Sequence, residues 1–153
     1  MINVDQLQSE LRRANLLPTR QRIALGSLLF GGDDRHVTAE ALYEQAISMK
    51  MLVSLATVYN TLHRFAEAGL LNRIVVGGSR IYFDTNTMPH HHFLLEETNE
   101  LFDLTEGALS VGCFRETPEG LEVARVDVIV RLRKIQNTNL NVRGECGSLA
   151  LRG

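Results

Sequence analysis

Cysteine is scarce in this chain of 153 residues, which contains Cys113 and Cys146 only. Two cysteines that lie far apart in the sequence are too few for a disulfide scaffold and lack the close spacing of zinc ligands. Long apolar runs are also missing, and so is the apolar core of an amino-terminal signal peptide. We therefore expect two free thiols in a cytoplasmic protein that does not enter a membrane.

Sequence motifs of the common enzyme classes are absent too. The chain contains no HExxH or CxxC motif and no GxGxxG or Walker-type phosphate loop. Gly77 and Gly78 have the position of a hairpin turn rather than of a nucleotide-binding loop. No pair of residues resembles a nucleophile with its general base, so we expect the protein not to be an enzyme.

The composition of the chain is typical of a globular domain. Hydrophobic residues make up 44% and charged residues 22%, which excludes a collagen-like, low-complexity or disordered chain. The net charge of −2 does not by itself indicate a nucleic-acid partner. The cationic side chains are nearly all arginine, since only Lys50 and Lys134 are lysine, and arginine suits bidentate contacts with phosphate and base edges.

Four amphipathic helices are predicted in the first half of the chain. Apolar residues recur at helical spacing in four segments, and Thr19, Thr38 and Ser54 are the N-cap residues of the last three. Gly69 follows the fourth segment, in the position where glycine commonly terminates a helix. The predicted helices cover residues 5–14, 19–30, 38–48 and 54–68.

Two β-rich runs, 70–76 and 80–83, follow these helices and are joined by a glycine-rich turn. This order is the layout of a winged helix-turn-helix, in which the fourth predicted helix enters the major groove of DNA and the hairpin is the wing. A solvated face or a protein-binding surface is the alternative, because winged helices also serve as protein-binding modules. The polar residues on the exposed side of that helix are Thr57, Asn60, Thr61 and Arg64, with Tyr59 near the boundary.

The second half of the chain has shorter elements. Residues 84–89 are a linker, and short strands are expected at 93–96 and 101–104, around a turn. Alternating apolar residues predict a half-buried strand over 126–132. Because so small a sheet has little core of its own, we expect it to dimerise. The sequence thus predicts an α+β protein, with an N-terminal winged helix-turn-helix over 1–84, a small α/β dimerisation and sensing lobe over 85–134, and a flexible tail over 135–153.

Three contiguous histidines, His90, His91 and His92, stand at the end of the linker. On an extended chain, His90 and His92 point to one face and His91 to the other. Two imidazoles at this spacing can share a zinc, iron or manganese ion, or the iron of haem. Three exposed histidines without a ligand are the alternative that the residues themselves leave open.

Several segments resemble those of the ferric uptake regulator family. The resemblance extends from about residue 7 to residue 133. Within that family, HHHF and EVARVDVIVRLRK (122–134) are similar to the iron response regulator branch. The segments that carry the family resemblance are LATVYNTLHRFAEAGLLNR (55–73), LPTR (17–20) with Arg22, HVTAEALY (36–43) and PHHHF (89–93).

This resemblance implies a homodimeric transcription regulator that binds double-stranded operator DNA. Tyr59 matches a tyrosine that is expected to touch a thymine methyl group, and Arg20 matches an arginine that is expected on phosphate. Asn60 stands where relatives usually have arginine, so we expect a different DNA preference. The candidate DNA-binding residues are Arg20, Thr57, Tyr59, Asn60 and Arg64.

The resemblance also implies a regulatory site for one iron, manganese or zinc ion per chain. A glutamate ligand of the family falls on Phe83, next to Asp84. The family's structural CxxC motif falls on Leu95 and Thr98, so no structural zinc held by four cysteines is expected. The metal ligands map onto His36, His90, His92 and Asp103.

The likeness to the iron response regulators implies haem as the signal, bound at His90, His91 and His92. Whether Cys113 supplies a further axial ligand stays open. We expect an iron- or haem-responsive regulator of iron-uptake and haem-synthesis genes, with haem or a haem-delivering protein as a partner. In this hypothesis, metal stabilises the DNA-competent arrangement and haem disrupts it. The alternatives are a regulator that senses a divalent metal directly, and a haem or metal carrier without a DNA role.

Overall fold

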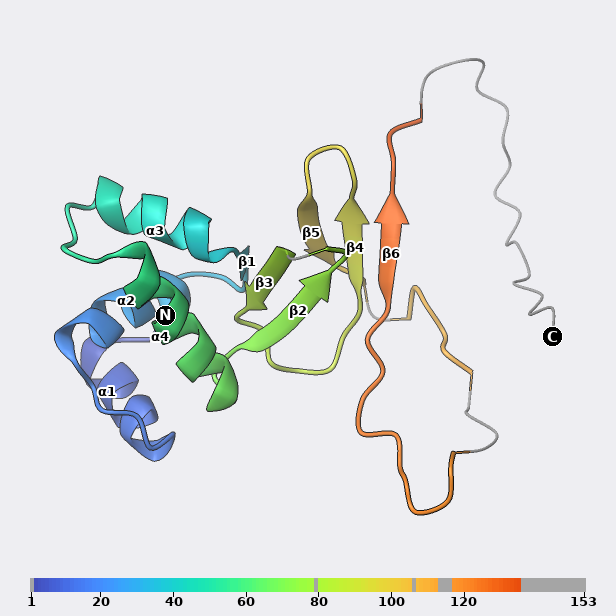
Figure 1. Cartoon of the computed structure of the whole chain (residues 1–153), viewed down its shortest axis with the longest axis horizontal. Coiled ribbons are helices and arrows are strands. Elements are labelled where there is room, and N and C mark those ends of the chain that lie inside the picture. Colours follow the sequence, from blue (N-terminus) through green and yellow to red (C-terminus); the bar gives the residue numbers. More distant parts are fainter. Residues whose placement is uncertain (1, 79, 106, 113–116, 136–153) are drawn as a thin grey trace.

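The four predicted helices are confirmed in the computed structural model, which describes residues 2–78, 80–105, 107–112 and 117–135. The hydroxyls of Thr19, Thr38 and Ser54 each accept a hydrogen bond from a backbone N–H in the first turn of the following helix. Gly69 has φ +74°, the left-handed conformation that ends α4. The helices are α1 (Val4–Arg13), α2 (Arg20–Phe30), α3 (Ala39–Ser48) and α4 (Leu55–Glu67) (Figure 1).

The main core lies among these helices and one face of the following sheet. Leu42 of α3 and Phe65 of α4 are fully buried in it, together with Phe83 from the sheet. Thr61 was expected to be exposed, but it is only 5% exposed. The reason is its spacing: Thr61 lies three residues after Val58 and four before Phe65, on the helix stripe that faces this core.

The predicted hairpin is confirmed as part of a three-stranded sheet. It consists of β2 (Asn72–Val76) and β3 (Arg80–Asp84), which pair antiparallel. A further strand, β1 (His36–Val37), pairs antiparallel with the other edge of β3. The sequence did not predict β1, because two residues are too few to show a period. Asp84 was placed in the linker, but it ends β3 and is fully buried.

A second three-stranded sheet follows, with the order β5-β4-β6. The predicted strands β4 (His92–Leu95) and β5 (Glu100–Asp103) are confirmed as an antiparallel pair, and β6 (Ile129–Leu132) runs parallel to β4. The strand expected from residue 126 begins only at Ile129. Its partner β4 begins at His92, which lies opposite Ile129, and the hydrogen bond of 3.0 Å from the His92 N–H to the carbonyl of Val128 lies at that end of the ladder.

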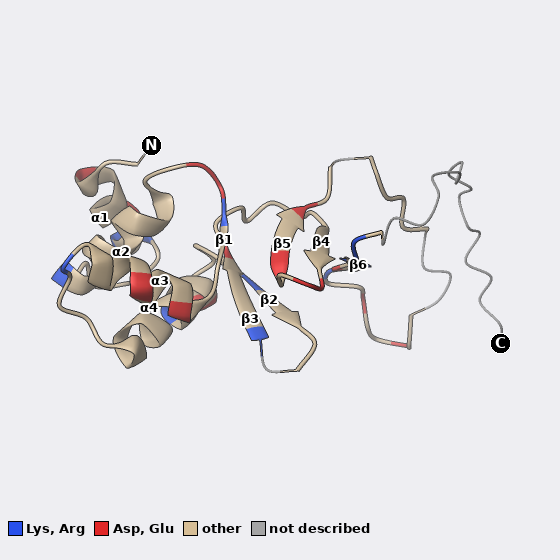
Figure 2. Cartoon of the chain, turned by 90° about the horizontal axis from the view of Figure 1, so that it is seen from above, with Lys and Arg blue, Asp and Glu red and all other residues tan. Residues whose placement is uncertain are grey.

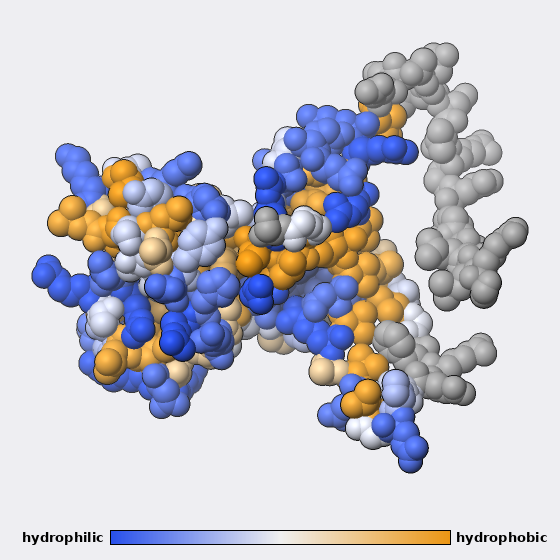
Figure 3. Space-filling view, viewed as in Figure 1, coloured by the Kyte–Doolittle hydropathy of each residue, from blue (hydrophilic) through white to orange (hydrophobic). Residues whose placement is uncertain are grey.

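The wing hairpin lies between the helices and the second sheet (Figure 1). Ile74, Val76 and Tyr82 of the wing form a second apolar cluster with Leu94 and Leu101 of the second sheet. The Tyr82 hydroxyl donates a hydrogen bond of 2.5 Å to a backbone carbonyl in the turn between β4 and β5. Apolar surface gathers over this junction and over the second sheet (Figure 3). The wing thus packs against the second sheet through this second cluster.

Two sequence expectations, the free thiols and the flexible tail, concern residues that the structure does not describe. Cys113, Cys146 and the predicted tail after Ile135 lie outside the described residues. Among the described helices, none is both long and apolar enough to cross a bilayer.

Replacing Leu42 by alanine tests the packing of α3. Leu42 is 0% exposed, so the cavity should lower the free energy of unfolding by about 2–5 kcal/mol. Ile47→Ala is the matched control, since Ile47 lies on the same helix and is 46% exposed; its cost should be about 1 kcal/mol or less. Urea unfolding followed by circular dichroism measures both, and equal losses would contradict this core assignment.

Candidate metal centre and nucleic-acid interface

Five titratable side chains converge between the helical lobe and the second sheet. Each of them offers one ligand atom, and these atoms all lie within 4.8 Å of one another. The four residues predicted as metal ligands are all brought together, and Asp84 joins them. The set, called the five-residue cluster below, is His36, Asp84, His90, His92 and Asp103.

Strand pairing brings these residues together. His36 in β1 lies directly opposite Asp84 in β3, and His92 in β4 lies directly opposite Asp103 in β5. Residues opposite each other in an antiparallel pair have Cβ atoms about 4.5–5.5 Å apart. Each sheet therefore contributes one histidine and one carboxylate, and His90 comes from the segment just before β4.

The ligand atoms of the cluster face one another at close range. The Nε2 atom of His36 lies 3.0 Å from Asp103 Oδ1, and His90 Nε2 lies 3.2 Å from oxygens of both Asp84 and Asp103. The Nε2 atoms of all three histidines, and Oδ2 of Asp84, are buried without a hydrogen-bond partner among the described residues. Since orphaned buried polar atoms are costly, this convergence fits a shared ligand.

The ring of His90 is oriented by a backbone contact. Its Nδ1 atom lies 2.7 Å from the carbonyl oxygen of Met88. Because a carbonyl can only accept, Nδ1 carries the proton and donates, which leaves the lone pair of Nε2 facing the cluster. Metal-binding histidines are commonly held in this way by a hydrogen bond at the other ring nitrogen.

The electrostatics of the cluster suit a cation. Burial lowers the pKa of His36, while the negative charges of Asp84 and Asp103 oppose this effect by raising it. The neutral imidazole, which is the form that binds metal, is thereby favoured at neutral pH. Three imidazoles and two carboxylates form a mixed nitrogen and oxygen donor set, which suits divalent iron, manganese or zinc.

The predicted DNA-binding residues lie on α4 and at the start of α2. Arg20, Asn60 and Arg64 are exposed, whereas Thr57 and Tyr59 are half-buried. Thr57 and Asn60 line a groove of about 280 Å³ together with residues at the start of α2.

Three of these side chains also have partners within the chain. The hydroxyl of Thr57 pairs with that of Ser54 at 2.9 Å, and Arg64 pairs with Glu67 at 3.0 Å. The hydroxyl of Tyr59 donates a hydrogen bond to Glu40 of α3.

The sequence profile of the ferric uptake regulator family matches residues 13–129. The chain belongs to the ferric uptake regulator family. The winged helix-turn-helix with a small α/β lobe is the fold of this family, whose members are metal-responsive transcription regulators that bind DNA as dimers.

Similar proteins agree with this membership. A ferric uptake regulation protein of Pseudomonas fluorescens is 35% identical over 98 residues, which cover 63% of this chain and 80% of that protein. The structure of the ferric uptake regulator from Pseudomonas aeruginosa with manganese superposes with a TM-score of 0.64 at 26% identity, covering 84% of this chain and 97% of that one. The Vibrio cholerae regulator shares the fold, with a TM-score of 0.67 at 21% identity and coverages of 83% and 98%.

In this member of the ferric uptake regulator family, the carboxylate of Asp84 takes the cluster position that the sequence resemblance assigned to Phe83. The family's glutamate ligand was mapped onto Phe83, but Phe83 is fully buried in the main core. Because successive residues of a strand face opposite sides, Asp84 faces the cluster when Phe83 faces the helices. The available signal was a carboxylate at the end of the predicted hairpin, shortly before the histidines.

The structure also separates the three histidines that were assigned together to haem. His90 and His92 direct Nε2 into the five-residue cluster, as the alternation of an extended chain predicted for this pair. His91 is not part of that cluster, and its Nδ1 atom is buried without a hydrogen-bond partner among the described residues. His91 lines a cleft of about 650 Å³ together with His90, so His90 borders both the five-residue cluster and this cleft.

The lowered pKa of His36 predicts how stability depends on pH in the metal-free protein. Below about pH 6.5 the unfolded chain binds a proton that the folded state takes up only at lower pH. The free energy of unfolding should therefore fall as the pH drops from about 7.5 to about 5.5. Urea unfolding in the presence of a chelator measures this slope, and His36→Asn should flatten it. An unchanged slope in the variant would show that other groups cause the effect.

Proposed function

We propose that this protein is a transcription regulator whose affinity for operator DNA depends on a divalent metal ion at the five-residue cluster. The observation that carries the proposal is the convergence of five ligand atoms within 4.8 Å, from both sheets. Iron, manganese and zinc all suit the donor set. When bound, such an ion would compensate the negative charge of the two facing carboxylates and accept the lone pairs of the three imidazoles.

The placement of the ligands explains how binding can act as a switch. His36 leads directly into α3 of the helical lobe, and Asp84 ends the wing. The other three ligands belong to the second lobe or to the segment that enters it. A ligand that contacts both lobes has different affinities for different lobe arrangements, which is the requirement for shifting a conformational equilibrium.

We further propose a division of labour between the two parts of the chain. Residues 1–84 bind DNA, with Arg20 on phosphate and α4 in the major groove, where Thr57, Tyr59, Asn60 and Arg64 reach the base edges. Residues 85–134 sense the ligand and form the homodimer, since their small sheet has little core of its own. Because the proposed partner is operator DNA, we propose that the protein acts in the cytoplasm.

Metal-dependent DNA binding tests the proposal directly. The probe is a duplex selected from a random-core library by the manganese-loaded wild-type protein. Fluorescence polarisation should show at least tenfold weaker binding by wild type after chelation, which corresponds to about 1.4 kcal/mol of coupling. The double variant His90→Ala/His92→Ala should bind weakly with or without manganese, because it lacks two of the three imidazoles.

The matched control is His91→Ala, which changes the adjacent histidine outside the cluster. It should retain the manganese dependence of wild type. If the double variant responded to manganese as wild type does, the five-residue cluster would not be the regulatory site. Calorimetric titration of manganese into each protein separates loss of metal binding from loss of DNA binding.

Haem is a second candidate ligand. Haem binding would also support membership of the iron response regulator branch, whose likeness to this chain implied it. One observation favours it: His91 lines a cleft of about 650 Å³ beside apolar side chains, among them Met88, Leu104 and Leu109. The orphaned Nδ1 of His91 makes this residue the candidate haem ligand that leaves the metal cluster intact. Haem ligation by His90 or His92 would instead compete with metal for the same nitrogen atoms.

A hemin titration of metal-free protein, followed by visible absorption, distinguishes these possibilities. We expect a saturable ligated spectrum in wild type, its loss in His91→Ala, and its retention in His90→Ala/His92→Ala, because only His91 lies outside the cluster. Hemin adsorbs to many apolar surfaces, so the variants are the essential controls. Equal spectra in all three proteins would identify haem binding as nonspecific and leave the divalent metal as the signal.

A further inference from the structure

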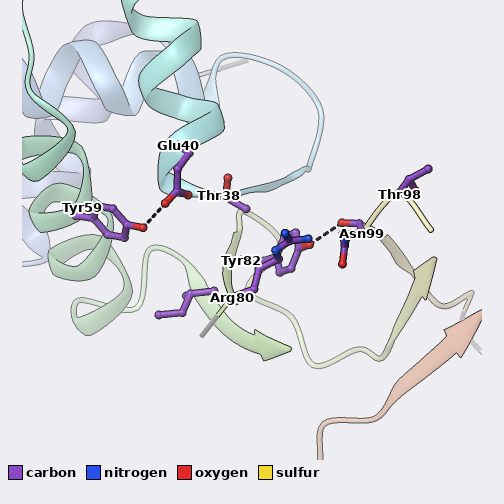
Figure 4. A pocket seen from close by; sticks show the side chains of 8 residues that line it. Thr38, Glu40, Tyr59, Arg80, Tyr82, Thr98 and Asn99 are labelled. Atoms are coloured by element: carbon purple, nitrogen blue, oxygen red, sulfur yellow. Dashed lines mark hydrogen bonds between the residues drawn. The ribbon is translucent and has the colours of Figure 1, made fainter. Parts of the chain in front are cut away.

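Tyr59, the candidate base-contacting residue of α4, is held on two sides in this structure. Its hydroxyl donates a hydrogen bond to the carboxylate of Glu40, which lies in the first turn of α3 (Figure 4). Its ring stacks on that of His63, one helical turn further along α4, with the ring centroids 6.4 Å apart and the planes at 17°. A ring with contacts at both its hydroxyl and its face has little freedom to rotate.

His63 also contacts the core. The ring of His63 packs edge-to-face on Phe83 of β3, with centroids 5.4 Å apart, and Phe83 is fully buried. The stack beneath Tyr59 therefore rests on a side chain that cannot move without disturbing the main core.

Glu40 is an unexpected residue in this position. It is exposed, and it lines a cleft of about 480 Å³ with Tyr59 and Arg80, at the junction of α3, α4 and the wing (Figure 4). A carboxylate beside a DNA-reading helix repels phosphate and weakens binding at every sequence. Figure 2 shows acidic positions on α3, and the charge of Arg80, which begins β3 and lines the same cleft, acts on Glu40 by lowering its pKa. The negative charge of Glu40 is therefore unfavourable for DNA binding, and its presence has an explanation if the hydrogen bond that Glu40 accepts from Tyr59 serves a separate purpose.

The protonation states fit a strong contact. The hydrogen bond from Tyr59 lowers the pKa of Glu40, and the same bond raises the pKa of Tyr59. At neutral pH, the acceptor is thus a carboxylate and the donor a neutral phenol. Hydrogen bonds with one ionised partner are shorter and stronger than those between neutral groups.

We propose that Glu40 is a positioning residue for sequence recognition, because it holds the Tyr59 ring in the orientation that reads a base edge. The inference rests on the proposed function, since it requires α4 to contact DNA. Glu40 lowers the affinity for all DNA through its charge and raises the preference for the operator through its hydrogen bond. The two effects have opposite signs and are separable by substitution.

Four variants separate the charge of Glu40 from its hydrogen bond. Glu40→Gln removes the charge and keeps an acceptor oxygen, whereas Glu40→Ala removes both. Tyr59→Phe keeps the ring and its stack on His63 and removes the donor, and the double variant Glu40→Ala/Tyr59→Phe completes a cycle. Glu40 is exposed, and thermal unfolding of each variant checks that the fold is retained.

The readout is a discrimination ratio between two duplexes. The first is the duplex selected by the manganese-loaded wild-type protein, and the second has the A·T pairs of its contacted region replaced by G·C pairs. Glu40→Ala and Tyr59→Phe should each lower the affinity ratio by about tenfold, as expected for the loss of one base contact. The double variant should lose no more than either single variant. Glu40→Gln should bind both duplexes more tightly and keep the ratio.

Three outcomes would overturn the proposal. A ratio unchanged in Glu40→Ala would show that the contact does not position Tyr59. Equal ratios in Glu40→Ala and Glu40→Gln would assign the effect to charge alone. Independent losses that multiply in the double variant would show that Glu40 acts through another residue. If wild type itself selects no duplex from the library, the proposed function fails before any variant is compared, so the two failures are distinguishable.

Discussion

The pairing of β1 with β3 is the constraint on which the rest of this structure depends. Only two residues of β1 take part, and they place His36 opposite Asp84 and Val37 opposite Phe83. One pair contributes ligand atoms to the five-residue cluster, and the other pair is buried in the main core. Without this pairing, His36 would belong to a loop between helices, and the cluster would have ligands from the wing and second sheet alone.

Strand β3 connects the two lobes because both of its faces are buried. Phe83 packs with the helices and Tyr82 packs with the second sheet, whereas Asp84 faces the cluster. A strand fixed on both faces cannot shift relative to one lobe without disturbing the other, because packed interiors transmit strain. A change at Asp84 therefore has a rigid route to the helical lobe, through the neighbouring residue Phe83.

The features that could be predicted from the sequence have a local physical cause. The helices follow from apolar spacing and from side chains such as Thr38 that cap their first turns, and the hairpin follows from its glycine-containing turn. Convergence of His36 with His90 and His92 was expected from resemblance only, since no local pattern brings residues so far apart in sequence together. Strand β1 and the role of Asp84 were missed because both depend on pairing between strands. Thr61 was wrongly predicted to be exposed, because the buried stripe of α4 is wider than the apolar residues of the helix alone indicate.

The proposed DNA-reading face of α4 and the five-residue cluster are connected by short segments of the chain. Glu40 follows His36 by four residues, within the segment that passes from β1 into the first turn of α3. Phe83, which supports the stack under Tyr59, is the neighbour of Asp84. Both contacts that hold Tyr59 are thus made, directly or through His63, by short rigid segments that also carry a cluster residue. Because β1 and β3 are paired next to these positions, the proposed metal site and the proposed positioning of Tyr59 depend on the same two strands. In the proposed function, the orientation of the Tyr59 ring is therefore a property of α4 that metal binding at the cluster can reach through a short path of contacts.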